Sequence, residues 1–422
     1  MNIGNRVQYM MHSHNLQNPT GKNGPILPEE WTVIQEGRLP LSEEQANYLA
    51  RFWKVPQAYL MKPYQIDIQI HRLLQDLQHE LLIKHDPDES IIARLAEPMS
   101  IPSITQEIIF YLLKSVYHYK YKQFEQVKQI EHEYLAFMLP DHNILKESVV
   151  FQRALFYFYG FKYFYEGKRE ESFSYFDRLL EKTADRDEIV AIIQNLSLIL
   201  KENGEYDRVI HYMKRLKRYS EEEQDGQVLA IALNYIGAMY IEKKAYRQAI
   251  HYFEQMKQLD LSPRLTARLY HNLGVLYFKL DNFKQAIEMY ETGKEVKEDY
   301  GINDGLFLSY HALFKAYHFN NDQRNAARYL EKAQTHAQDE SEETLLILAK
   351  AQTLETEAPE QALIWYEKAL DYYERHHIKA KLETIYPAFA ELAAQLGQYK
   401  KANDSQAKLE QLHNENSDAK QA

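Results

Sequence analysis

Two places in this sequence come near to known chemical motifs, and both fail on spacing. Gly21-Lys22 suggests a phosphate-binding loop, but the spacing GxxxxGK[ST] is absent and no strand precedes the pair. His79-Glu80 suggests a zinc-protease helix, but Ile83 stands where that motif needs its second histidine. The sequence therefore indicates no catalytic residue, no metal site and no cofactor, and we expect a protein that is not an enzyme.

Composition narrows the function further. The chain has no cysteine, which excludes thiol catalysis, disulfides and cysteine metal sites, and its 17 histidines are scattered. A net charge of −11 argues against non-specific nucleic-acid binding by the chain as a whole. The first residues lack the apolar run of a signal peptide, and no stretch approaches the roughly 20 apolar residues of a membrane span. We therefore expect a cytoplasmic protein without a membrane contact.

A repeated pattern of helical pairs organises most of the chain. Residues 265–296 form two amphipathic segments joined at LDN, and Phe283 precedes the small residue Ala286 by three positions. The same small position recurs at a spacing of 36 to 40 residues, at Ser172, Val209, Ala249, Ala286, Ala326, Ala362 and Ala402, with an earlier copy at Val127. A helical hairpin cannot bury its apolar stripe alone, so this period predicts a solenoid of stacked hairpins.

The central units resemble the tetratricopeptide repeat. Gly237 and Gly274 occupy the Gly position of its Leu-Gly signature, and Tyr240 and Tyr277 follow them. The resemblance covers about residues 101–412 and implies an all-α superhelical array of about eight hairpins, each a few residues longer than the usual ~34.

In such arrays the first helix of each hairpin lines the inner groove, so the resemblance also implies which residues would face a ligand. Counted from the Gly position, they are Tyr157, Gln194, Asn195, Asn234, Arg268, His271, Asn272, His311 and Lys315. An asparagine amide offers a donor and an acceptor to an extended backbone, which suits a short peptide. Arg268 and Lys315 could meet a peptide carboxylate. The alternative is that Asn195 and Asn272 are the ordinary asparagines of the repeat, bridging within the solenoid.

The N-terminal segment, residues 1–64, differs from the rest. From Trp31 we expect a helix ending at Gly37, a turn through Pro40, a helix capped by Ser42 with Glu44 behind it, and a short helix after Pro56. This closely resembles the second half of a Cro/repressor-type helix-turn-helix domain. Where that family has its second helix, this chain has LQNPTGKNGPI, which is rich in poor helix formers.

If this degenerate domain binds DNA, the resemblance places Glu29, Glu30, Thr32, Arg38 and Arg6 at the interface. Carboxylates repel phosphates and pair only with the amino group of cytosine. Residues 1–62 carry six basic and five acidic side chains, a net of +1. The sequence leaves open whether this fold still binds DNA.

Between the two parts, residues 65–100 form a linker in which 66–82 are expected to be helical. The array then occupies 101–412, and 413–422 form a polar tail expected to be disordered.

A degenerate repressor-type domain, a linker helix and a repeat array with groove asparagines resemble the peptide-sensing Rap/Rgg/NprR/PlcR/PrgX superfamily, with the length and repeat number of its NprR branch. The resemblance implies a cytoplasmic receptor for a signalling oligopeptide, functioning as a homodimer. We expect a transcriptional regulator whose DNA binding the peptide controls. The alternative is a Rap-like adaptor that binds a response regulator or another protein and no longer contacts DNA. Rap-type phosphatase action needs a glutamine on an N-terminal helical bundle, which we cannot match here.

Overall fold

The fold is built from helices alone in the part of the chain that the computed structural model describes, which comprises residues 3–13, 19–20, 24–84, 93, 101–139 and 147–418. The chain divides into two compact units, Met1–Asn195 and Leu196–Ala422, which meet inside one helix. Among the described residues, no helix is long and apolar enough to cross a membrane.

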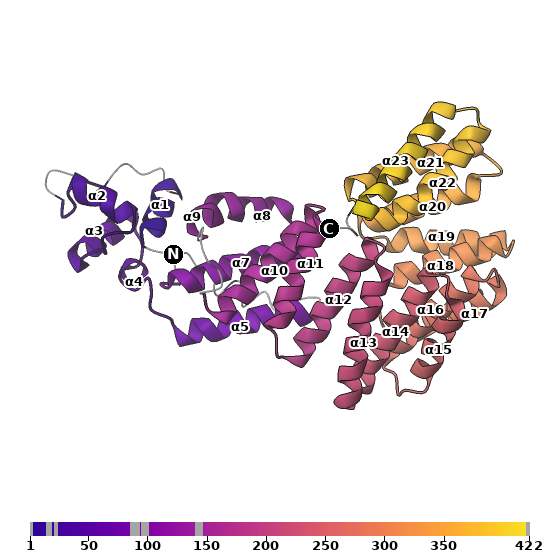
Figure 1. The fold of residues 1–422 in the computed structure, drawn as a ribbon, viewed down its shortest axis with the longest axis horizontal. Coiled ribbons are helices and arrows are strands. Elements are labelled where there is room, and N and C mark those ends of the chain that lie inside the picture. Colours follow the sequence, from indigo (N-terminus) through magenta and orange to yellow (C-terminus); the bar gives the residue numbers. More distant parts are fainter. Residues whose placement is uncertain are drawn as a thin grey trace. The chain divides into compact units, whose positions relative to one another are not determined.

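The N-terminal unit begins with four short helices that share a core (Figure 1). They are α1 (Ile3–Ser13), α2 (Pro28–Gln35), α3 (Glu43–Trp53) and α4 (Gln57–Met61). As expected, α2 is followed by a turn with Gly37 at φ 69°, and Ser42 caps α3. The capping box is closed by Gln45 and not by Glu44, because the reciprocal bond needs the third residue after the cap. Residues 14–18 and 21–23 lie outside the described residues. In the segment rich in poor helix formers, the described residues 19, 20 and 24–26 are not helical.

The linker helix and the first hairpins complete this unit. Asp67 caps α5 (Ile68–Ile83) by accepting from the backbone N–H groups of Gln69 and Ile70. The hairpin helices that follow are α7 (Ile104–Lys120), α8 (Phe124–Ile130) with the π-helical turn η1 (Glu131–Leu135) and α9 (Ala136–Met138), α10 (Val149–Tyr165) and α11 (Arg169–Glu181). The next helix, α12 (Arg186–Glu202), runs from this unit into the second.

The C-terminal unit continues the array as stacked helical hairpins (Figure 1). Its helices are α13 (Tyr206–Glu222), α14 (Gly226–Glu242), α15 (Tyr246–Lys257), α16 (Pro263–Lys279), α17 (Phe283–Asp299), α18 (Leu306–Phe319), α19 (Gln323–His336), α20 (Glu340–Leu354), α21 (Pro359–Arg375), α22 (Lys379–Gln395) and α23 (Tyr399–Asp418). The helix α23 continues to Asp418, whereas the sequence analysis expected a disordered tail from residue 413. Residues 419–422 lie outside the described residues.

The repeat pattern read from the sequence corresponds to the packing. Each of the eight small positions, from Val127 to Ala402, lies in the second helix of a hairpin and is at most 3% exposed. The glycine of the first helix faces an aromatic ring of the second. A Cβ on Gly274 would lie 2.4 Å from the ring of Tyr290, and one on Gly237 would lie 2.5 Å from the ring of Phe253. Glycine is therefore required there for close helix packing.

Candidate peptide-binding face

Two asparagines expected in the groove are hydrogen-bonded to each other. Nδ2 of Asn272 on α16 donates to Oδ1 of Asn234 on α14 over 2.8 Å. Asn234 is buried and Asn272 is half-buried. Among the described residues, no further protein group bonds the Nδ2 of Asn234 or the Oδ1 of Asn272. The pair therefore joins two neighbouring hairpins. It leaves the Nδ2 of Asn234 able to donate and the Oδ1 of Asn272 able to accept a further hydrogen bond.

Two histidines, His271 on α16 and His311 on α18, are held neutral. Burial, followed by the charge of Lys297, lowers the pKa of His271 to about 4. Burial, followed by the charge of Lys315, lowers the pKa of His311 to about 3. The ring of His311 also lies parallel to that of Phe307, with 6.0 Å between centroids. At neutral pH both imidazoles can therefore donate and accept a hydrogen bond without carrying charge.

Four lysines mark a face that the first helices share. They are Lys201 on α12, Lys279 on α16, Lys315 on α18 and Lys381 on α22. Burial and then Lys381 and Lys279 lower the pKa of Lys315 to about 8. Burial and then Lys201 lower the pKa of Lys381. Because these charges act on one another across several hairpins, the first helices of the C-terminal unit face a common space, which we call the concave face.

A pocket opens at one end of the concave face, where α16, the end of α17 and the start of α18 meet. Its volume is about 180 Å³, and Arg268, His271 and Asn272 of α16 contribute to its lining. Lys297 of α17 and Asp304 of the following loop also contribute. Nη2 of Arg268 lies 3.9 Å from a carboxylate oxygen of Asp304. The pocket thus adjoins the asparagine pair through Asn272, and three of its four charged lining residues are cations.

Comparisons with known proteins agree with this architecture. The sequence profile of the tetratricopeptide repeat matches residues 267–300. Response regulator aspartate phosphatase I of Bacillus subtilis (strain 168) is 22% identical over 270 residues, which are 58% of this chain and 67% of that protein. A solved Rap protein in complex with competence and sporulation factor has a TM-score of 0.60 at 13% identity, covering 83% of this chain and 99% of that one. The apo form of the quorum sensor NprR from B. thuringiensis has a TM-score of 0.55 at 15% identity, covering 82% and 99%.

The chain is similar to Rap and NprR proteins and shares their tetratricopeptide-repeat superhelix. The likeness to the B. subtilis protein is one of sequence, and the solved structures share the repeat superhelix. A further structure with this fold is the Rap conjugation gene regulator of plasmid pLS20 in complex with the Phr* peptide, with a TM-score of 0.53 at 10% identity. The match covers 80% of this chain and 96% of that one.

Most of the expected groove residues lie in the C-terminal unit. Asn234, Arg268, His271 and Asn272 lie on α14 and α16, and His311 and Lys315 lie on α18. Gln194 and Asn195 are half-buried on the part of α12 that belongs to the N-terminal unit. Their role in peptide binding stays a prediction.

The expectation for Tyr157 was wrong. Its side chain is 1% exposed inside the N-terminal unit, and its hydroxyl donates to the backbone carbonyl of Leu81 over 2.8 Å. Burial raises its pKa strongly. Tyr157 therefore fastens α10 to the linker helix α5 and is not available to a ligand.

The expectation for Arg6 at a DNA interface was wrong for the same reason. The guanidinium is fully buried, and its Nη2 donates to Oε2 of Glu107 on α7 over 2.7 Å. It also donates to the backbone carbonyls of Tyr59 and Pro102. The hydroxyl of Tyr59 donates to the other oxygen of Glu107 over 2.6 Å. Arg6 thus fixes the N-terminal helices to the first repeat helix and cannot contact phosphate.

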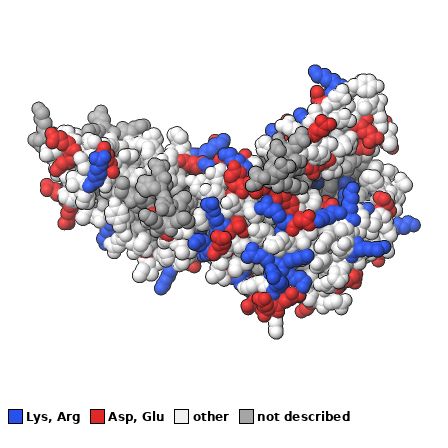
Figure 2. All heavy atoms as spheres, in the orientation of Figure 1, with Lys and Arg blue, Asp and Glu red and all other residues white. Residues whose placement is uncertain are grey.

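The other residues expected at DNA lie on or beside α2. Glu29 and Thr32 are exposed, while Oε2 of the half-buried Glu30 accepts from the backbone N–H of Leu27. Arg38 is exposed and lies 3.2 Å from a carboxylate oxygen of Glu36. On the face drawn in Figure 2, the region of α2 and α3 shows more acidic than basic surface. This surface offers little attraction to phosphate.

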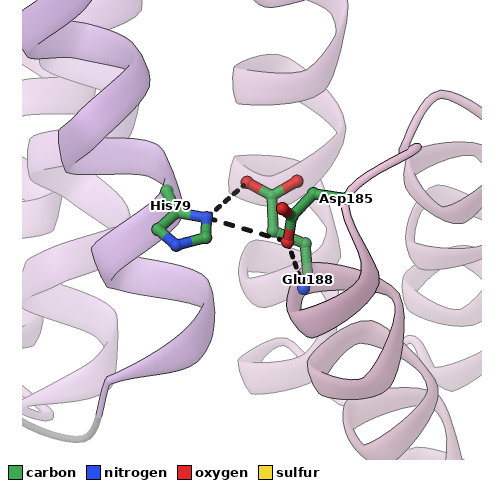
Figure 3. A group of neighbouring side chains, drawn as sticks. All are labelled: His79, Asp185 and Glu188. Carbon is green, nitrogen blue, oxygen red and sulfur yellow. Dashed lines mark hydrogen bonds and ion pairs between the residues drawn. The ribbon is translucent and has the colours of Figure 1, made fainter.

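A group of ionisable side chains outside the concave face is better described as an ion-pair network than as a metal site. Nδ1 of His79 on α5 lies 3.3 Å from Oε1 of Glu188 and 3.9 Å from Oδ1 of Asp185 (Figure 3). Oδ1 of Asp185 also accepts from the backbone N–H of Glu188 at the start of α12. Because Arg153 on α10 pairs with the other oxygen of Glu188, the carboxylate is already neutralised. We therefore assign no metal to it.

Sequence reasoning missed several residues of the concave face, namely Lys201, Lys279, Lys381, Arg264, Lys297 and Asp304. Lys279 lies two helical turns beyond Asn272, so its basic charge on a groove helix was one signal that could have revealed it. Lys297 and Asp304 come from a second helix and a loop, and counting along first helices does not reach them.

Proposed function

We propose that this protein is a peptide-responsive regulator in which a short oligopeptide binds along the concave face of the C-terminal unit. The observation that supports it is the Asn234–Asn272 pair, whose remaining donors and acceptor match the carbonyl and N–H groups of an extended peptide. The neutral imidazoles of His271 and His311 add further groups able to donate or accept. Recognition of this kind would depend on the peptide backbone and leave side-chain selection to the pocket.

The peptide would act by changing how neighbouring hairpins pack. In a solenoid each repeat contacts only its neighbours, so a ligand that bridges α14, α16 and α18 biases their spacing, and small changes add along the array. The peptide shifts the array from its unbound hairpin spacing to its bound spacing only by the difference between its affinities for the two. The change in hairpin spacing would reach the N-terminal unit through the helices that precede the concave face in the chain.

For the output we propose a protein contact rather than DNA binding, made by the N-terminal unit. Of the two arginines expected at DNA, Arg6 is buried on Glu107 and Arg38 is paired with Glu36. The exposed carboxylates Glu29, Glu43 and Glu44 would be repelled by phosphate. A response regulator is the kind of partner that the superfamily resemblance implies.

DNA binding is the second candidate, and one observation favours it. The order of α2, the turn after Gly37, the capped helix α3 and the short α4 follows the second half of a repressor-type domain. In that arrangement the exposed start of α2, at Glu29 and Thr32, would approach the bases.

A salt series distinguishes the two outputs. Fluorescence anisotropy would measure binding of the protein to DNA fragments from the region upstream of its own gene. The salt concentration would run from about 50 to 200 mM, with and without an extract of short peptides. We expect no specific retention at low salt under either condition. Specific binding that weakens steeply with salt and responds to peptide would overturn the protein-contact output in favour of DNA.

A further inference from the structure

The pocket at the end of the concave face concentrates positive charge in a chain that is acidic as a whole. Arg264, Arg268 and Lys297 line it, against the single carboxylate of Asp304. The chain as a whole has a net charge of −11. Among the described residues, Arg264 forms no ion pair, and the contact of Arg268 with Asp304 is long at 3.9 Å. The pocket therefore has more positive than negative charge available to a ligand.

Lys297 is the most constrained of these cations. Its side chain is 9% exposed, and its Nζ donates to the backbone carbonyl of Gly305 over 2.6 Å and to Oγ of Ser309 over 3.1 Å. An ammonium group has three donors, so one remains after these two bonds. Gly305 has φ 65° and leaves space for Nζ, because a Cβ there would lie only 3.0 Å away. The loop thus holds the ammonium in place and allows it to face the pocket.

We propose that this pocket binds a carboxylate of the peptide. The inference rests on the proposed function and specifies its ligand class. Arg268 and Arg264 supply exposed guanidinium groups that can bind a carboxylate in a bidentate manner, and Lys297 supplies a buried charge. Asn272 borders the same pocket, so the carboxylate would lie next to the backbone-binding pair.

The carboxylate has two sources in a peptide, an Asp or Glu side chain and the free C-terminus. The chemistry is the same for both, and a pocket of about 180 Å³ has room for either group. Amidation of the C-terminus removes one source and leaves the other, so a pair of matched peptides distinguishes them.

The lysines elsewhere on the concave face would also favour an anionic ligand. Within the described residues, none of Lys201, Lys279, Lys315 and Lys381 forms an ion pair with a carboxylate. Burial lowers the pKa of Lys297 to about 8, and burial with neighbouring lysines lowers that of Lys315 to about 8. Clustered ammonium groups that repel one another are stabilised when an anion binds among them.

The test uses the full-length protein and three matched pools of short synthetic peptides. The first pool has one Glu at a fixed position, the second has Gln there, and the third keeps Glu and carries a C-terminal amide. Affinity is measured by competition with a fluorescent member of the first pool. We expect the Glu pool to bind at least about tenfold more tightly than the Gln pool if a side chain fills the pocket. If the C-terminus fills it, the amide pool loses that factor instead.

Two variants locate the effect. Arg268→Gln on α16 and Lys297→Met on α17 should remove the preference for the carboxylate. Lys284→Met, an exposed control on the same helix as Lys297, should keep it. Thermal melting establishes that each variant is folded, and the exposed Arg268 provides a second test if Lys297→Met unfolds.

Equal binding of all three pools, unchanged in both variants, would overturn the carboxylate pocket and leave peptide binding intact. Binding of no pool would overturn the proposed function together with this inference.

Discussion

Nδ2 of Asn272 donates to Oδ1 of Asn234 over 2.8 Å, joining the first helices of two neighbouring hairpins, α16 and α14. The bond supports the interpretation of Asn272 as a bridge within the solenoid, and its contact with a peptide stays a prediction. A bridging amide is rigidly placed, and a rigidly placed amide is a better partner for a peptide backbone than a mobile one.

Replacing Asn272 with Ala should therefore weaken peptide binding by roughly 1–3 kcal/mol, because a backbone group of the ligand and the amide of Asn234 both lose a partner. Isothermal titration calorimetry with a peptide selected by the wild-type protein measures the change.

Gln248→Ala on the outer helix α15 is the matched control, since Gln248 is exposed and its loss should leave the affinity unchanged. Unchanged affinity of Asn272→Ala would show that this amide serves the solenoid alone.

The glycines of the repeat provide a prediction about stability. Gly274→Ala should destabilise the protein by about 1–3 kcal/mol, because its Cβ would lie 2.4 Å from the ring of Tyr290. Gly226→Ala is the control, because a Cβ at that helix position meets nothing within 4 Å. Alanine there should be neutral or stabilising by up to about 1 kcal/mol. Denaturant unfolding of both variants gives the comparison, and equal effects would refute the close packing.

The Arg6–Glu107 pair predicts a large effect from a residue that the sequence placed at DNA. Arg6→Met should cost about 3–5 kcal/mol, since it leaves the carboxylate of Glu107 buried beside Tyr59 without its cation. Arg38→Met, which breaks the exposed pair with Glu36, should cost less than about 1 kcal/mol. Similar melting temperatures for the two variants would mean that Arg6 is not structural.

The two neutral histidines predict how stability changes in acid. Their pKa values in the folded protein, about 4 for His271 and about 3 for His311, lie below the value of about 6.5 in an unfolded chain. Protons therefore bind the unfolded state first, and stability falls as the pH decreases from about 6.5 through these folded-state values. Above pH 6.5 the contribution is complete.

The measurement is the melting temperature between pH 7.5 and 4 for the wild type and His311→Gln. The variant should lose less stability over this interval, because one of the two buried imidazoles is gone. Parallel curves would indicate that His311 is protonated as easily in the folded protein as in water.

The repeat array was largely predictable from the sequence because its determinants are local. The small residues such as Ala286 and the glycines such as Gly274 follow from the helical period and from the facing aromatic ring of the same hairpin. The cap at Ser42 is likewise determined by residues three positions apart.

The errors came from partners distant in sequence. Tyr157 lies on a first helix as counted, but the linker helix covers it through the carbonyl of Leu81. Arg6 lies on α1, but its partner Glu107 is 101 residues away. Helical periodicity identifies a face without showing what covers it, and it does not reveal a pocket formed partly by a loop such as the one holding Asp304. The homodimer remains a prediction.

Peptide binding at the concave face is tested most directly by comparing the peptides that the wild type and a variant retain from a random synthetic pool. Wild-type protein and the Asn234→Ala/Asn272→Ala double variant, each shown to be folded by its melting curve, are incubated with the pool, and the retained peptides are identified by mass spectrometry. We expect the wild type to retain a defined, reproducible set of peptides that the double variant does not retain. Retention of no set by the wild type, or of the same set by both proteins, would contradict peptide binding at the concave face.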